Sequence, residues 1–470
     1  MKLKVDKNYI CFAVSRKSEE RKLHFYKGDE KFMELDIRLI DNEPDFVFPM
    51  DVSNYKGETI EIKCEPEELL LAAVSFSDEK PAAEYKYRPV VHFTAERGWI
   101  NDPNGLIYAD GLYHLFYQWN PYGTDWGNMH WGHAVSRDLI TWEHRPTAME
   151  PDEYGTIYSG SAWRDTKNAA GFGKDALLFY YTASGGRNEW SKEKGNLHTQ
   201  RLAVSVDGGE TLEKKETVVP FIVNENRDPK VFWHEASKAY IMALYLDEDQ
   251  FMILRSDDLL HWTESQRFSA DKMWECPNLF ELPIESKPGE TKWVFWSADG
   301  YYQIGEFDGY KFTPETEVLE GYKTKLGYAA QTFAGVDDRT IHVTWYRTEN
   351  DKGGFRGMMS IPTELSLVET DKGLRIAFKP VRELWECFNE TETVALDGGS
   401  CKVNPDGKPV VLIIEYESGV TEVRILDHGI IECFSEGGTS YTAVEAEEHI
   451  LNKELLIKGD LKDVVMKTVR

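Results

Sequence analysis

Three acidic residues in this chain share a local setting that suits catalysis. Asp102, Asp228 and Glu275 are each followed within two residues by proline and then by an apolar stretch typical of a β-strand. A strand end is a rigid mounting for a carboxyl group. Hydrolysis of a glycosidic bond uses two carboxyl groups, one ionised and one protonated. The three acids therefore fit glycoside hydrolysis, and the alternative is that each is an ordinary turn residue or a local ion pair.

The neighbours of these acids suggest different roles for them. Asp102 lies among asparagines and turn amides, which favour an ionised carboxylate. Trp274 and Cys276 flank Glu275, and apolar surroundings favour a protonated carboxyl group. We therefore expect Asp102 to be the ionised group and Glu275 the acid, with Asp228 beside Arg227 as a third member.

Other catalytic motifs are missing from the sequence. It has no G-x-S-x-G elbow and no phosphate-binding glycine loop. His130 and His133 lie three residues apart in a strand-like segment, so their side chains point to opposite faces and we interpret them as structural. The six cysteines are scattered, with no zinc-type spacing. We expect no metal and no cofactor.

Composition limits the classes of partner. The 470 residues carry a net charge of −27, which disfavours nucleic acid and anionic membranes. No apolar run is long enough for a membrane span, and residues 1–16 alternate polar with apolar side chains rather than forming a signal peptide. We expect a cytoplasmic protein, or a secreted one if a signal was removed, and a homodimer is left open.

Strand and turn patterns divide the chain into three units. Residues 1–88 alternate with period two and predict a small β domain. Residues 89–355 contain short aromatic strands, and the turn S-x-D-L-x-x-W occurs at Ser136 and again at Ser256, with a weaker copy at Ser205. Such repetition predicts a five-bladed β-propeller, with a sandwich as the alternative. Residues 356–470 predict a C-terminal β-sandwich, so the fold class is all-β.

Several motifs, in order along the chain, resemble glycoside hydrolase family 32, the β-fructosidases that include invertases, inulinases and levanases. The similarity runs from about Pro89 to Thr442. Asn278 departs from it, because that position is commonly Asp. The motifs that carry the resemblance are W-x-N-D-P-N-G at 99–105, F-Y-Q at 116–118, W-G-H-A at 131–134, Y-S-G-S at 158–161, R-D-P at 227–229, W-E-C-P at 274–277, and R-G followed by M-S-I-P at 356–362.

The resemblance implies a reaction and a role for each site residue. Asp102 is the implied nucleophile of a retaining hydrolysis through a fructosyl-enzyme intermediate, Glu275 the acid and base, and Asp228 the stabiliser of the transition state. The implied substrates are levan, inulin or sucrose, cleaved in an exo manner. Two alternatives stay open, a fructosyltransferase and a non-catalytic fructan-binding protein. The implied substrate-binding residues are Trp99, Asn101, Gln118, Trp126, Ser159 and Arg227.

Overall fold

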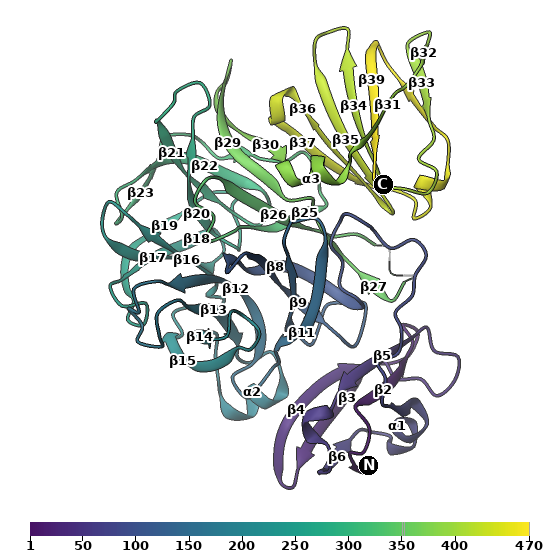
Figure 1. Cartoon of the computed structure of the whole chain (residues 1–470). Helices are drawn as coiled ribbons and strands as arrows, with labels where there is room; N and C mark the ends of the chain where they lie inside the picture. The colour runs from purple at the N-terminus through teal and green to yellow at the C-terminus, as the bar shows by residue number, and fades with distance from the viewer. Residues whose placement is uncertain (350, 352, 470) are drawn as a thin grey trace.

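The computed structural model describes residues 1–349, 351 and 353–469, and its regular secondary structure is almost entirely β-strand. An N-terminal β domain, a ring of five sheets and a C-terminal β-sandwich follow one another along the chain (Figure 1). The predicted all-β class with a five-bladed propeller is therefore confirmed. Within the described residues, no helix has both the length and the apolar character that crossing a membrane requires.

The N-terminal domain has two sheets with one shared core. Its strands alternate, so that Ile60 and Ile62 of one sheet are buried together with Ile10 and Phe12 of the other. The first sheet has the order β1 (Lys2–Lys4), β6 (Thr59–Lys63), β3 (Arg21–Lys27) and β4 (Glu30–Ile37), the second has β5 (Phe46–Asp51), β2 (Tyr9–Val14) and β7 (Val74–Ser77), and the connections contain η1 (Ser53–Tyr55) and α1 (Glu67–Ala73).

Each propeller blade is a sheet of four antiparallel strands, mostly consecutive in the chain, with the first strand at the ring axis, and short additional strands join some of the blades. Blade one is β8 (Gly98–Ala109), β9 (Leu112–Asn120), β10 (His130–Ser136) and β11 (Trp142–Met149). Blade two is β12 (Thr156–Asp165), β13 (Ala176–Ser184), β14 (Thr199–Ser205) and β15 (Glu213–Val219). Blade three is β16 (Arg227–His234), β17 (Ala239–Asp247), β18 (Gln250–Ser256) and β19 (Thr263–Ser269). Helix α2 (Glu189–Lys194) lies between β13 and β14.

The last two blades contain additional short strands. Blade four is β20 (Asn278–Pro283), β21 (Thr291–Trp296), β22 (Tyr301–Phe307) and β23 (Phe312–Pro314), with β24 (Leu319–Glu320) beside β22. Blade five is β25 (Gly327–Thr332), β26 (Thr340–Tyr346), β29 (Thr363–Thr370) and β30 (Gly373–Pro380), with β28 (Met358–Met359) beside β26. Because β29 and β30 complete blade five, the predicted boundary at residue 355 falls inside a sheet. We propose that the propeller extends to residue 380 and the sandwich follows it.

The repeated serine–aspartate turns occupy equivalent places in three blades. Each connects the third strand of its blade to the fourth. Asp138 accepts hydrogen bonds from the second and third N–H groups after it, at 3.0 and 2.6 Å, and Asp258 repeats this at 3.0 and 2.8 Å. These are Asx turns, whose carboxylates replace backbone acceptors. The similar turns in the sequence therefore arise from one strand connection repeated around the ring.

The ring closes where the beginning of the propeller meets its last segments. The short strand β27 (Phe355–Arg356) pairs in parallel with the start of β8, and the Gly98 N–H donates to the Gly354 carbonyl at 2.7 Å. Further along β8, Ile107 forms a bridge with Ala334 of blade five. Contacts between distant parts of the chain therefore hold blades one and five together.

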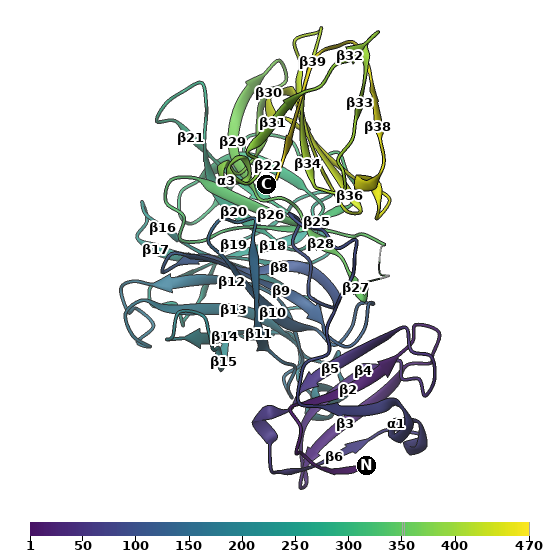
Figure 2. The same ribbon diagram turned by 45° about the vertical axis from the view of Figure 1, so that its right-hand side comes forward.

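The C-terminal sandwich packs beside blade five (Figures 1 and 2). Phe434 and Tyr441 stack with ring centroids 4.6 Å apart, and Tyr441 also contacts Phe378 of β30 at 5.2 Å. After α3 (Arg382–Cys387), one sheet has β31 (Glu390–Thr393), β39 (Leu461–Thr468), β34 (Val410–Tyr416), β35 (Thr421–Asp427), β36 (Ile430–Ser435) and β37 (Ser440–Glu445), the other has β32 (Leu396–Asp397), β33 (Ser400–Val403) and β38 (Leu455–Lys458), and the turns contain η2 (Glu436–Gly438) and η3 (Ile450–Asn452).

A buried histidine just before the first propeller strand contacts two carboxylates of the C-terminal sandwich. His92 lies between Asp427, 3.0 Å from Nδ1, and Glu432, 3.1 Å from Nε2, and all three side chains are inaccessible to solvent. Burial alone disfavours the imidazolium, but the hydrogen bonds and charges of the two carboxylates outweigh it and raise the pKa of His92 to about 9. His92 is therefore a cation at neutral pH.

Replacement of His92 by glutamine is expected to destabilise the protein strongly at neutral pH. Removing the buried cation leaves two carboxylates without their partner, at a cost of about 3–5 kcal/mol. Because the folded-state pKa is raised, the contribution of His92 is complete below its unfolded value near 6.5 and is lost as the pH rises through about 9. Thermal unfolding of wild type and H92Q at pH 6.5 and 9.5 should show a smaller difference at the higher pH. A constant difference would contradict this.

Candidate active site

Irregular strand pairing places the predicted site residues at the ring axis. In β8, Ile100 pairs with Trp119 and Pro103 with Tyr117, so three residue steps on the inner strand oppose two on its neighbour. Asp102 lies inside this bulge. The same three-against-two step occurs in three other inner strands, between Ile157 and Gly160 in β12, between Arg227 and Lys230 in β16, and between Tyr328 and Gln331 in β25. A bulge redirects a side chain, and here it does so in four blades.

The other two acids have an unusual backbone conformation. Asp228 lies in the bulge of β16 with φ 64°, while Glu275 and Cys276, just before β20, have φ 49° and 40°. Residues with a side chain rarely adopt the left-handed region, and such strain often accumulates at functional sites. The strained backbone at these residues therefore costs local stability and orients their side chains towards the axis.

A ring of hydrogen bonds orients the carboxylate of Asp102. The Trp99 indole donates to Asn101 Oδ1 at 3.1 Å, and the Asn101 amide donates to Gln118 and, at 3.1 Å, to Asp102 Oδ1. Gln118 donates to Ser159 Oγ at 2.8 Å, and Ser159 donates to Asp102 Oδ2. Four predicted binding residues therefore hold both oxygens of Asp102 in place.

The environment of Asp102 corrects one expectation. Burial raises the pKa of Asp102 to about 6, the nearby Glu275 charge adds to the increase, and the hydrogen bond from Ser159 opposes it. The groups that contact this carboxylate are side chains in a buried site, such as those of Asn101 and Ser159, rather than the turn amides that the sequence suggested. Because this value lies below 7, the ionised form still prevails at neutral pH.

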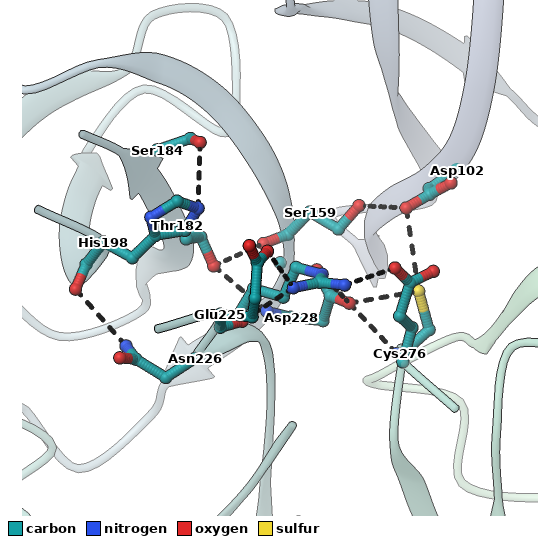
Figure 3. A network of polar contacts seen from close by, with 12 residues as sticks. Asp102, Ser159, Thr182, Ser184, His198, Glu225, Asn226, Asp228 and Cys276 are labelled. Carbon is teal, nitrogen blue, oxygen red and sulfur yellow. Dashed lines mark hydrogen bonds and ion pairs between the residues drawn. The ribbon is translucent and has the colours of Figure 1, made fainter. Parts of the chain in front are cut away.

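Asp228 lies beside Asp102 and shares Cys276 with it (Figure 3). The Cys276 N–H donates to Asp228 Oδ2 at 3.0 Å, and its Sγ lies 3.5 Å from that oxygen and 3.6 Å from Asp102 Oδ2. Burial raises the pKa of Asp228 to about 7, and the charges of Glu275 and Asp102 add to this while Arg227 opposes it. A negative charge on one of these carboxyl groups therefore raises the pKa of its neighbours and disfavours their ionisation.

Ligand-type atoms of Asp102, Asp228 and Cys276 lie within 4.8 Å of one another, a spacing that a metal ion could use. However, burial raises the pKa of the Cys276 thiol well above its usual range, whereas a metal ligand must be a thiolate. Both aspartates are also drawn towards their neutral forms. In the protein alone, these three groups are therefore drawn towards neutral forms, which can form hydrogen bonds with the hydroxyl groups of a ligand.

Glu275 is surrounded by polar groups. Arg227 donates to Glu275 Oε1, Tyr328 donates to Oε2, and the carboxyl side chain is 22% exposed. Trp274 is 42% exposed, and its ring contacts Tyr245 with centroids 5.8 Å apart. The expectation of apolar surroundings is wrong, because Arg227 of blade three and Tyr328 of blade five bind the carboxyl group. Tyr328 and Cys276 were missed as site residues.

Trp126 lies at the rim of the site, in the loop between β9 and β10. Its residue is 55% exposed, and the edge of its ring contacts Tyr158 with centroids 6.1 Å apart. The other predicted residues meet at the axis. Arg227 bridges Glu275 and Glu225, whose Oε2 it contacts at 2.8 Å, and it lies over the Tyr245 ring at 4.6 Å.

The axis beneath the acids is nearly filled. Lys230 is buried there and donates to the Thr332 carbonyl at 2.6 Å, and burial lowers the pKa of its amine to about 7. Gln331 donates to the Gly160 carbonyl at 3.0 Å. Both residues and Asp228 line a cavity of about 10 Å³, the size of one water molecule. Side chains therefore fill most of this part of the axis.

Comparisons with known proteins identify the family of this chain. The model of the Glycosyl hydrolases family 32 N-terminal domain matches residues 92–380. The levanase of Bacillus subtilis (strain 168) is 39% identical over 350 residues, which cover 67% of this chain and 50% of the levanase. An extracellular exo-inulinase of Aspergillus niger is 33% identical over 356 residues, 64% of this chain and 66% of the inulinase. The chain thus spans half to two thirds of these relatives.

Solved structures give the same architecture. The crystal structure of exo-inulinase from Aspergillus awamori superimposes with a TM-score of 0.72 at 24% identity, and the match covers 83% of this chain and 99% of that one. At this identity the likeness shows the fold alone. Together with the family match over the whole propeller, it establishes that this chain belongs to glycosyl hydrolase family 32.

Proposed function

We propose that this protein hydrolyses β-fructosides such as levan, inulin or sucrose, and releases fructose. The observation that carries the proposal is the convergence of Asp102, Asp228 and Glu275 from three blades on the ring axis, with Asp102 oriented by four side chains. The names of related proteins, levanase and exo-inulinase, point to the same substrates.

We assign the roles from the contacts of each acid. The Asp102 carboxylate attacks the anomeric carbon of fructose while Glu275 gives its proton to the departing oxygen, which produces a fructosyl-enzyme ester and a free alcohol. Glu275 then takes a proton from water, which attacks the ester, releases fructose and restores Asp102. Two displacements at one carbon retain its configuration. Asp228 and Arg227 bind hydroxyl groups as positive charge develops on the ring.

We propose exo action, in keeping with the names of the related exo-inulinases. We also propose a cytoplasmic location, in keeping with the six cysteines, which are all free thiols.

The proposal is tested by product chromatography on levan, inulin and sucrose. Release of fructose as the first product from at least one of them supports it. Accumulation of longer oligosaccharides at high sucrose would identify a fructosyltransferase instead, because another sugar would then intercept the ester. A protein that binds fructan and releases no product would be a binding protein.

A further inference from the structure

The N-terminal domain lies on the face of the propeller at which the strands that carry Asp102 and Ser159 begin. Asp102 and Ser159 are near the starts of β8 and β12. Because neighbouring strands are antiparallel, the loops that follow β9 and β13 emerge at that same face. The domain contacts both loops through hydrogen bonds, and Figure 2 shows it below blades one and two.

The first of these loops is built into the N-terminal domain. The Asn128 side chain accepts from the Asp36 N–H and donates to the Asp36 carbonyl, both at 2.7 Å. It therefore pairs with the backbone of β4 in the way that a residue of an adjacent strand does. Tyr122 enters the core of the domain, where its ring meets Phe12 edge-on at 6.2 Å. The loop 120–128 is therefore held at both ends.

The second contact involves helix α2. Glu34 accepts from the Trp190 N–H at 3.2 Å, and Lys31 lies 3.2 Å from Glu193 and 5.6 Å from the centre of the Trp190 ring. Glu34 and Lys31 are largely shielded from solvent, with side chains 2% and 10% exposed. Two sets of contacts therefore fix the orientation of the domain relative to the site.

A cleft remains between the domain and the loop 120–128. Its cavity has a volume of about 160 Å³, comparable to one sugar ring. Its walls combine both charges and an aromatic ring, and we define the rim cleft by five of its residues, Arg16, Glu20, Arg38, Asp125 and Trp126.

The rim cleft adjoins the catalytic pocket through Trp126. This side chain lines the cleft and also contacts Tyr158, the residue before Ser159, which donates to Asp102. Asp125, another wall residue, lies 3.1 Å from Arg356, which stacks over Trp99 of the hydrogen-bonded ring at 5.1 Å. Two series of side-chain contacts therefore link the cleft to the residues that orient Asp102.

We propose that the rim cleft is a distal sugar-binding subsite, which holds a unit of a β-fructan chain whose terminal fructose lies at Asp102. This inference rests on the proposed function. An exposed indole presents a flat apolar face to a sugar ring, while guanidinium and carboxylate groups donate to and accept from its hydroxyl groups. Because both charges are present, a neutral polyhydroxyl ligand fits better than an anion.

A pair of adjacent glutamates provides the test. Glu20 lines the cleft with a side chain that is 56% exposed, whereas Glu19 lies outside it and is 82% exposed. Glu20→Trp fills the cleft, and Glu19→Trp is its matched control. We expect E20W to raise KM for long levan or inulin by about five- to tenfold, in line with a lost contact of roughly 1 kcal/mol, with kcat/KM for sucrose unchanged. E19W should match wild type on all three substrates.

The outcomes separate the subsite from the proposed function. Equal effects of E20W on polymer and sucrose, or no effect on polymer, would overturn the subsite while leaving hydrolysis in place. If wild type hydrolysed nothing, the function would fail, and electrophoresis in gels containing levan would still test the cleft. Retardation of wild type and E19W but not of E20W supports the subsite, and equal migration of all three overturns it.

Discussion

Asp102→Asn is expected to reduce fructose release by about 10⁴-fold or more, the scale of losing a catalytic nucleophile. Asparagine has nearly the same shape as aspartate and keeps an acceptor for Ser159, so the pocket should survive. The amide cannot form the ester with fructose. The measurement is kcat on sucrose, together with fructose affinity by calorimetry, which should change little.

Asp207→Asn provides the matched control for this variant. Asp207 lies in the turn between β14 and β15, where it accepts from Ser205 and Thr211 far from the axis. The same chemical change there should leave kcat close to that of wild type. Near-normal turnover of D102N, with mass spectrometry excluding deamidation, would refute the role of Asp102.

The second large effect is expected for Glu275→Ala. Loss of a general acid typically costs about 10²–10⁴-fold in rate, so sucrose hydrolysis should fall by that amount. A fructoside whose leaving group is a weak base, such as a nitrophenolate, needs no proton, so formation of its ester should remain fast. The ester should then accumulate, because Glu275 no longer activates water, and mass spectrometry should detect it on Asp102.

Azide distinguishes this mechanism from general damage to the site. As a nucleophile that needs no base, azide should restore turnover of the nitrophenyl substrate and give a fructosyl azide of retained configuration. A product of inverted configuration would mean that water or azide attacks fructose directly. Equal losses on activated and natural substrates would exclude Glu275 as the acid.

The propeller could be predicted because its signals are local. The turns at Asp138 and Asp258 each close within a few residues and repeat in the sequence as they do in space. The acids were also recognisable, since Asp102 and Asp228 lie inside bulges marked by a following proline. A turn or a bulge depends mainly on its own residues, which is why sequence reasoning finds it.

The features that were missed depend on distant residues. Tyr328 reaches Glu275 from another blade, 53 positions along the chain, and nothing near either residue indicates the contact. The surroundings of Glu275 were inferred from Trp274, its neighbour in sequence, whereas Arg227 and Tyr328 from other blades bind its carboxyl group. Similarly, β29 lies beyond the predicted boundary, because pairing between β26 and β29 determines it and pairing partners are chosen by the whole sheet.

The closure of the ring bears on how activity is acquired during folding. Most blade strands pair with their neighbours in sequence, so each sheet can form soon after its own segment is available. The site is different, because Asp102, Asp228 and Tyr328 belong to blades one, three and five and meet only when these blades have come together in the ring. Contacts over such separations form slowly. Catalysis is therefore a late event in folding. Recovery of activity during refolding reports closure of the propeller ring rather than the content of β-sheet.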